Sequence, residues 1–371
     1  MNHVLQNLMR HAIRLTQAGR LTEATAAIQS ALKGASKSTF SDKPNPYEVV
    51  ADEDLPAKQA PSGIILDGCV FEAKYESKDE FTSGTHTHAA LTRRYKLYVP
   101  AGSASQQRPL VVMLHGCTQN PDDFAVGTGM NEQASKQGLC VLYPEQSQDA
   151  NPQRCWNWFK HNHQRRGRGE PALIASMTQA IMKEHNIDPR RVFIAGLSAG
   201  GAMAAIVADA YPEIFAAAGV HSGLPNGAAS NVAEALAVMS SGQSGNGMPP
   251  IQAAKPIQPT QQTQRLVPTI VFHGDQDRTV HPRNGEQVIA SALGEAAAKP
   301  RVTQGVSANG RRYTSATHHG VAGEVLAEHW LVHGAGHAWS GGHAKGSYTD
   351  AKGPDATAEM LRFFFAHPQT K

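Results

Sequence analysis

The sequence predicts an α/β fold built on a mostly parallel central sheet with helices on both faces. Short β-type runs alternate along the chain with longer segments of helical periodicity, which is the pattern of successive strand and helix units. The run at 110–114 is apolar at every position, as expected of a central strand that is buried on both sides. No internal repeat interrupts this alternation.

The predicted strands and helices extend from residue 94 to residue 366. Strands are expected at 94–99, 110–114, 140–143, 192–195, 269–272 and 329–333. The most regular helical patterns lie at 172–185, 199–210 and 355–366. Residues 223–266 break the alternation with a short helix candidate at 232–239 and a stretch rich in Gly, Ser, Pro and Gln. We expect an excursion or a small lid there.

Residues 1–61 are expected to form an N-terminal helical segment and linker, separate from a catalytic domain at 62–371. Apolar residues between positions 4 and 32 recur at roughly helical spacing, with one break, so two short amphipathic helices are predicted. Residues 33–61 are rich in Ser, Pro, Lys and Asp, as linkers are. The helices could dock on the main domain, cap it or recruit a partner, and docking is the simplest interpretation.

Composition excludes several classes of protein. A chain of 371 residues with 40% hydrophobic and 18% charged residues can bury a sizeable globular core. Its formal charge of +3 is too small to indicate nucleic acid or an anionic membrane as a partner. The sequence has no apolar run of about 18 residues, so no transmembrane segment is predicted. The first residues also lack the apolar region of a signal peptide.

A serine at the end of a predicted strand is the strongest candidate for chemistry. Residues 191–201 read RVFIAGLSAGG, so a strand leads into Gly196-x-Ser198-x-Gly200 and then into an alanine-rich helix. This arrangement is typical of a nucleophile elbow, in which bulky neighbours would clash and glycine flanks the serine. We expect Ser198 to be a nucleophile, and a structural glycine turn is the alternative.

A nucleophilic serine needs a base, and the base needs an acid that orients it. In this type of fold the order is Ser, Asp, His, with each residue on a loop after a strand. Asp275 and Asp277 both follow the strand at 269–272. We expect Asp277, which lies further into the loop, to be the acid and Asp275 to brace the turn. His333 falls at the end of the last strand and His337 on the loop that follows. We expect His337, among glycines and small residues, to be the base, and His333 to be a packed histidine.

Two backbone N–H groups are candidates for an oxyanion hole. One belongs to Ala199, at the N-terminus of the helix after the serine. The other is expected in the loop LHGCTQN at 114–120, where Gly116 lets the backbone turn so that the N–H of Cys117 points to the same place. His115 is expected to brace this loop and to take no direct part in chemistry.

At these residues the chain resembles the poly(3-hydroxybutyrate) depolymerase family of esterases, which also contains feruloyl and acetylxylan esterases. The resemblance covers most of 110–364, and its combination of motifs is highly specific. The matching segments are VVMLHGCTQN (111–120), YPEQ (143–146), CWNWF (155–159), RRVFIAGLSAGGAMA (190–204), HSGLPNGAA (221–229), VFHGDQDRTV (271–280), HGAGHAWSGG (333–342) and GSYTDAKGPDATAEMLRFF (346–364).

The resemblance implies an α/β-hydrolase fold and a serine carboxylic-ester hydrolase that works through an acyl-enzyme. It assigns the nucleophile to Ser198, the acid to Asp277, the base to His337 and the oxyanion loop to Cys117. Expected substrates are 3-hydroxybutyrate oligomers, polyhydroxyalkanoate or short-chain esters. Because the chain ends at Lys371 without the adsorbing domain of secreted depolymerases, soluble oligomers and short esters are the easier substrates to expect.

The resemblance also implies a disulfide between Cys117 and Cys155, with two separate buried thiols as the alternative. Cys140 lies in an apolar run and is expected in the core, while Cys69 has no evident partner. An extracellular location is implied by the family. Because no signal peptide is visible, the cytoplasm is the alternative.

Three tryptophans lie beside the oxyanion and histidine loops. They could line an acyl or alkoxy pocket for a hydrophobic ester, since such pockets are mostly apolar, and core packing is an equally good interpretation of each. The three residues are Trp156, Trp158 and Trp339.

The expected partner is thus an ester substrate, without metal or organic cofactor. The sequence has no HExxH motif, no paired CxxC and no dinucleotide-type glycine loop. Alternatives are a feruloyl or acetylxylan esterase, a serine peptidase and a non-catalytic granule-binding protein. The sequence predicts no particular oligomeric state.

Overall fold

The computed structural model describes residues 78–102, 106–242, 265–294 and 299–370. These residues belong to one compact unit of the chain, which runs from Ala73 to Lys371. The predicted N-terminal helices, the linker, the boundary near residue 61 and Cys69 lie outside the described residues, and so does half of the predicted excursion, at 243–264.

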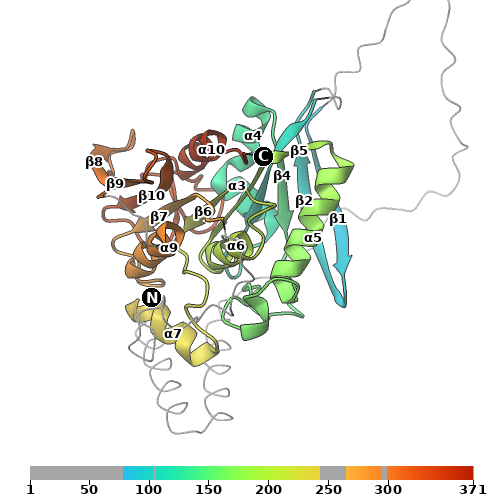
Figure 1. Ribbon diagram of the computed structural model, residues 1–371, viewed down its shortest axis with the longest axis horizontal. Coiled ribbons are helices and arrows are strands. Elements are labelled where there is room, and N and C mark those ends of the chain that lie inside the picture. Colours follow the sequence, from blue (N-terminus) through green and yellow to red (C-terminus); the bar gives the residue numbers. More distant parts are fainter. Residues whose placement is uncertain (1–77, 103–105, 243–264, 295–298, 371) are drawn as a thin grey trace, which may run out of the picture. The chain divides into compact units, whose positions relative to one another are not determined.

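The described residues form a ten-stranded sheet in the order β1-β2-β4-β3-β5-β6-β7-β10-β9-β8 (Figure 1). The six central strands, from β4 to β10, pair in parallel, while the pairs toward both edges are antiparallel. The strands are β1 (Glu80–His88), β2 (Leu91–Val99), β3 (Arg108–Leu114), β4 (Cys140–Pro144), β5 (Ile187–Leu197), β6 (Ala217–His221), β7 (Thr269–Gly274), β8 (Arg301–Val306), β9 (Arg312–His319) and β10 (Val325–Val332).

Helices cover both faces of the sheet, which confirms the predicted α/β architecture. One face packs against α5, α6 and α9, and the other packs against α3, α4 and α10 (Figure 1). The helices are α3 (Pro121–Thr128), α4 (Met130–Gln137), α5 (Gly169–Glu184), α6 (Ala199–Ala210), α7 (Val232–Ser241), α9 (Arg283–Leu293) and α10 (Ala356–Ala366).

Strand β3 explains why an uninterrupted apolar run is required at the centre. Val112 packs into the layer that contains α5 and α6, whereas Val111 and Met113 pack into the layer that contains α4 and α10. All three side chains are fully buried. A strand between two helical layers has no solvent-facing side, so alternation with polar residues is lost.

The short helix predicted within the excursion is present as α7. Its first turn is capped by Asn231, whose side-chain oxygen accepts a hydrogen bond of 3.0 Å from the N–H of Glu234. The helix ends at Gly242, which adopts φ 65°. Capping at both ends defines this helix although its residues 232 and 236 are exposed.

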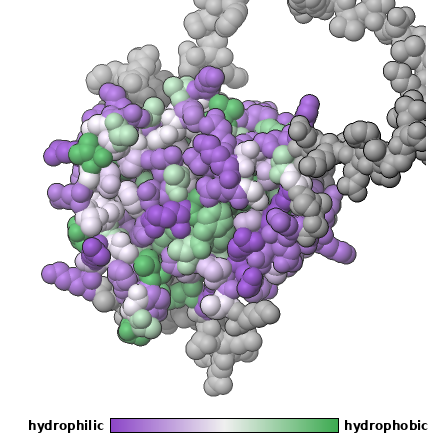
Figure 2. Space-filling model, turned by 90° about the horizontal axis from the view of Figure 1, so that it is seen from above, coloured by the Kyte–Doolittle hydropathy of each residue, from purple (hydrophilic) through white to green (hydrophobic). Residues whose placement is uncertain are grey.

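The surface of the described residues is mainly hydrophilic in the view of Figure 2, with a limited hydrophobic area near its centre. None of the helices in the described ranges is long and apolar enough to span a lipid bilayer.

Parallel pairing brings the carboxyl ends of β3, β5, β6, β7 and β10 to one edge of the sheet. Loops that follow parallel strands therefore meet at this edge, where ligand sites of open α/β sheets are found. A short two-stranded sheet, β11 (Trp339–Ser340) with β12 (Thr349–Asp350), lies in the chain that follows β10.

Candidate active site

Ser198 occupies a strained turn between β5 and α6. Its backbone adopts φ 58° and ψ −120°, a conformation that L-residues rarely adopt. A Cβ at Gly196 would overlap the backbone of Gly200, and a Cβ at Gly200 would overlap the carbonyl oxygen of Leu114. Both glycines are therefore required by close backbone approach, as the motif predicts.

Asp277 and His337 form a hydrogen-bonded pair at the same edge. Nδ1 of His337 lies 2.7 Å from Oδ2 of Asp277. The other carboxylate oxygen accepts backbone N–H bonds of 2.9 Å from Thr279 and from Val280. Burial alone would raise the pKa of Asp277, but hydrogen bonds from His273, His337 and Val280 outweigh it and hold the pKa well below its ordinary value. The carboxylate is thus charged, and it fixes the tautomer of His337 with the proton on Nδ1.

The competing pair, Asp275 and His333, is also hydrogen-bonded, but it braces the ends of strands. Nδ1 of His333 lies 2.9 Å from Oδ2 of Asp275, and the other oxygen of Asp275 accepts the N–H of Gly334 at 2.7 Å. The second ring nitrogen of His333 lies 2.8 Å from the hydroxyl of Thr314 on β9. Both ring nitrogens are therefore engaged within the protein.

The loop after β3 lies directly against Ser198. A Cβ built on Gly116 would be 3.7 Å from Cβ of Ser198. In the described part of the chain, no protein acceptor takes the backbone N–H groups of Cys117 and Ala199. Two free donors close to a serine can stabilise an oxyanion.

A disulfide joins Cys117 to Cys155, with a Cα–Cα distance of 4.2 Å. The predicted pairing is confirmed, and it ties the loop after β3 to the segment at 155–159. Cys140 is a buried free thiol in the core, as expected.

His115 is fully buried and holds the same loop in place. Its Nδ1 donates to the carbonyl oxygen of Gly116 at 2.8 Å, while Nε2 accepts the backbone N–H of Gln146 at 3.1 Å. Burial lowers its pKa to about 4, so the ring is neutral near pH 7. This bracing role is the one expected from the sequence.

His221, at the end of β6, joins the turn of Ser198 to the loop of His337. Its carbonyl oxygen accepts the N–H of Ser198 at 2.8 Å, and its Nε2 accepts the N–H of Ser340 at 2.9 Å. The ring stacks between Phe272 and Trp339, at centroid distances of 5.8 and 5.1 Å. Burial, and then the neighbouring histidines, hold the pKa of His221 well below 6.5.

His221 is a residue that sequence reasoning missed. The only available signal was its place in the HSGLP segment of the family resemblance, because its contacts come from residues distant in the chain. Within the described ranges, no direct hydrogen bond joins Ser198 Oγ to Nε2 of His337. The two residues are instead linked through His221.

The three tryptophans are buried, with exposed fractions of 0% for Trp156, 4% for Trp158 and 1% for Trp339. The indole N–H of Trp156 donates to the carbonyl of His115 at 3.1 Å, and that of Trp339 donates to the hydroxyl of Thr357 at 3.0 Å. These contacts are those of core residues, the alternative that the sequence left open beside a pocket role.

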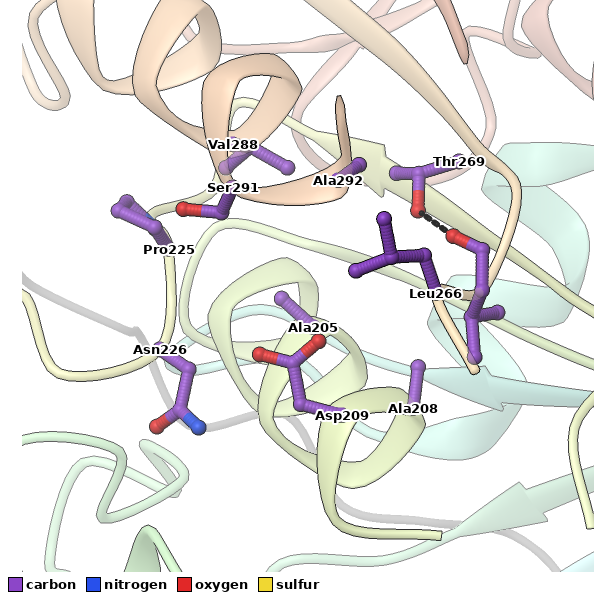
Figure 3. A pocket seen from close by; sticks show the side chains of 11 residues that line it. Ala205, Ala208, Asp209, Pro225, Asn226, Leu266, Thr269, Val288, Ser291 and Ala292 are labelled. Atoms are coloured by element: carbon purple, nitrogen blue, oxygen red, sulfur yellow. Dashed lines mark hydrogen bonds between the residues drawn. The ribbon is translucent and has the colours of Figure 1, made fainter. Parts of the chain in front are cut away.

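A cavity of about 30 Å³ lies between α6 and α9, lined among others by Ala205, Asp209 and Ser291 (Figure 3). It has the volume of about one water molecule. Ala205 is seven residues past Ser198 on α6, which corresponds to about 10 Å along the helix axis. This cavity is therefore distinct from the space around Ser198. Across the described ranges, no three His, Cys, Asp or Glu side chains form a group that could hold a metal ion.

The sequence is similar to known esterases. A family model described as esterase PHB depolymerase matches residues 93–320. Poly(3-hydroxyalkanoate) depolymerase C of Paucimonas lemoignei is 37% identical over 145 residues, which are 39% of this chain and 34% of that protein. Probable acetylxylan esterase A of Aspergillus clavatus is 30% identical over 202 residues, 52% of this chain and 62% of that protein. The chain thus spans less than two thirds of the length of either relative.

Two solved structures have a fold similar to that of this chain. The acetyl xylan esterase from Aspergillus awamori matches with a TM-score of 0.58 at 18% identity, over 77% of this chain and 99% of that one. The S-formylglutathione hydrolase from Agrobacterium tumefaciens matches with a TM-score of 0.50 at 13% identity, over 78% of this chain and 96% of that one. The fold is therefore the α/β-hydrolase fold, as expected.

Proposed function

Because the chain belongs to the esterase PHB depolymerase family, we propose that it is a serine hydrolase of carboxylic esters. Ser198 is the nucleophile, His337 the general base and Asp277 the residue that orients the histidine. The observation that carries this proposal is the 2.7 Å hydrogen bond between His337 and a buried, charged Asp277, at the sheet edge where the strained Ser198 lies.

The reaction proceeds in two steps that use the same groups. Oγ of Ser198 attacks the ester carbonyl carbon while its proton passes to Nε2 of His337. The electron pair of the carbonyl bond moves to oxygen, which the N–H groups of Cys117 and Ala199 stabilise. The C–O bond to the alcohol then breaks, and His337 returns the proton to the leaving oxygen. A water molecule repeats the sequence on the acyl-enzyme, releases the acid and regenerates Ser198.

Proton transfer requires that Ser198 Oγ and Nε2 of His337 come into contact when substrate binds. Catalytic hydrogen bonds are often long in a free enzyme and tighten in the complex with substrate. Asp277 holds Nδ1 of His337, which leaves Nε2 as the ring atom that can accept the serine proton.

Esters of hydroxyalkanoic acids, including 3-hydroxybutyrate oligomers, are the first candidate substrates, because a poly(3-hydroxyalkanoate) depolymerase is among the relatives. Acetylated or feruloylated carbohydrate is the second candidate, because an acetylxylan esterase and a feruloyl esterase are among the relatives. The disulfide between Cys117 and Cys155 supports an extracellular location, since disulfides persist in oxidising compartments. We further propose that residues 62–371 are the catalytic domain.

The test compares the wild type with Ser198→Ala on p-nitrophenyl butyrate, a 3-hydroxybutyrate trimer, an acetylated xylo-oligosaccharide and a feruloyl ester. Ser291→Ala is the control, since Ser291 lines the cavity between α6 and α9, which is distinct from the space around Ser198. The proposal expects ester hydrolysis that Ser198→Ala abolishes and Ser291→Ala retains. Full activity of Ser198→Ala would overturn it.

A further inference from the structure

Tyr348 lies between the loop of His337 and the loop of Cys117, which carry two parts of the proposed site. Its ring centroid is 6.5 Å from that of His337, with the ring planes at 77°. Its hydroxyl lies 3.2 Å from Oγ1 of Thr118, the neighbour of the proposed oxyanion donor Cys117. The residue is nevertheless 48% exposed. A large aromatic side chain therefore faces solvent between the base and the oxyanion loop.

The backbone of Tyr348 is held in a conformation that a tyrosine rarely adopts. Its φ is 51°, in the left-handed region that favours glycine. The carbonyl oxygen of Tyr348 accepts the N–H of Trp339 at 2.7 Å, and the next residue, Thr349, pairs with Trp339 in the β11–β12 sheet. The strained residue is thus fastened to the same loop that carries His337.

The residues before Tyr348 are anchored on the other side, to α3. The N–H of Ser347 donates to Oδ1 of Asp123 at 2.8 Å, and the side chain of Gln119 donates to the carbonyl of Ser347 at 3.2 Å. The backbone of Gly346 packs against that of Gly127 so closely that a Cβ there would overlap it. These anchors on both sides hold Tyr348 in its strained backbone conformation. Strained residues of this kind are common at ligand sites.

Core packing does not account for this tyrosine. A half-exposed ring contributes little burial, and glycine at the same position would remove the strain. The ring has a defined orientation instead, because its hydroxyl contacts Thr118. A fixed and exposed aromatic face next to a catalytic base is suited to contact with a substrate.

We propose that Tyr348 forms the wall of the alcohol side of the active site and selects esters with an apolar, bulky leaving alcohol. The inference rests on the proposed function. His337 delivers its proton to the leaving oxygen, so the group beside its ring lies next to the alkoxy part of the ester. In an oligoester, that part is the following hydroxyacid unit, whose methyl and methylene groups would lie on the ring.

The experiment compares ethyl butyrate with benzyl butyrate, which share the acyl group and hence the acyl-enzyme. The wild type is expected to favour the benzyl ester in kcat/KM. Tyr348→Ala is expected to reduce this preference by about 10-fold or more, as loss of an apolar contact does. Tyr348→Phe keeps the ring and is expected to keep most of the preference. The relative kcat/KM values for p-nitrophenyl acetate, butyrate and octanoate, which differ only in the acyl group, are expected to be the same in the variants as in the wild type.

Tyr348→Gly separates a substrate role from a structural one. Because glycine accepts the left-handed φ, the midpoint of thermal unfolding is expected to stay equal or rise, while the benzyl preference is lost. The inference is overturned if Tyr348→Ala and Tyr348→Gly retain the benzyl preference, or if they change the acyl-length ratio instead. If the wild type hydrolyses no ester, the proposed function has failed, which is a different outcome from unchanged selectivity in an active enzyme.

Discussion

Nε2 of His221 accepts a hydrogen bond of 2.9 Å from the backbone N–H of Ser340, on the loop that carries His337. The carbonyl of the same histidine accepts the N–H of Ser198. One buried residue therefore joins the turn of Ser198 to the loop of His337. Since its Nε2 is an acceptor, the ring must be neutral, with its proton on Nδ1.

Replacing His221 separates this acceptor from the packing of the ring. His221→Phe keeps an aromatic ring but leaves the N–H of Ser340 buried without a partner, which costs about 1–3 kcal/mol of stability. We expect kcat to fall with little change in KM. His221→Gln places an acceptor oxygen at a similar reach and is expected to recover kcat better than His221→Phe. Equal kcat values in both variants would contradict a positioning role for the acceptor.

Asp277→Asn is expected to lower kcat by roughly 10³–10⁴-fold with the fold intact. The oxygen that accepts from Thr279 and Val280 would stay in place, so the amide NH₂ would face His337. The histidine would then carry its proton on Nε2, where it cannot accept the proton of Ser198. Asp275→Asn is the matched control. If that control loses as much activity as Asp277→Asn, the choice between the two pairs is wrong.

Reduction of the disulfide is expected to destabilise the protein and weaken catalysis. The bridge between Cys117 and Cys155 closes a loop with a sequence separation of 38. The lower entropy of the unfolded chain then stabilises the folded protein by about 4 kcal/mol. Urea unfolding with and without dithiothreitol measures the effect. It should persist in Cys140→Ala, which lacks the buried free thiol, and vanish in a Cys117→Ser/Cys155→Ser variant. An equal effect of dithiothreitol on that double variant would be inconsistent with this account.

Stability is expected to fall as the pH drops from 7 toward 4. Burial lowers the folded-state pKa of His115 to about 4 and that of His221 well below 6.5, while the unfolded chain binds protons near pH 6.5. Below pH 6.5 the unfolded state therefore gains protons that the folded state does not. The free energy of unfolding then falls by about 1.4 kcal/mol per pH unit for each histidine. Asp277 adds to the loss only below its ordinary pKa of 3.8. Urea midpoints that stay constant from pH 7 to pH 5 would contradict the neutral state of both rings.

The sequence predicted the central part of the fold because buried parallel strands leave a clear pattern. Apolar runs such as 110–114 have no solvent-facing side, and the loops that follow them converge at one edge. This convergence is why the Asp277–His337 pairing could be expected from the order of residues alone. Asp275 and Asp277 also bind different histidines, with Asp275 on His333 and Asp277 on His337.

The edges of the sheet were harder to predict. Strand β8 is exposed at nearly every position, and β1 is rich in Thr and His, so neither carries the apolar pattern of a buried strand. The roles of His221 and Tyr348 could not be predicted for a different reason. Their contacts join segments more than a hundred residues apart, and no local pattern encodes them.

The most direct test of the central claim is to identify the residue that a serine-directed alkyl phosphonate labels. The intact protein is treated with the reagent, and peptide mass spectrometry locates the adduct while hydrolysis of p-nitrophenyl butyrate is followed. We expect one adduct, on Ser198, that forms at the rate at which activity disappears and is absent from Ser198→Ala. Labelling of Thr118 or Ser222, or loss of activity without an adduct on Ser198, would contradict the proposed mechanism.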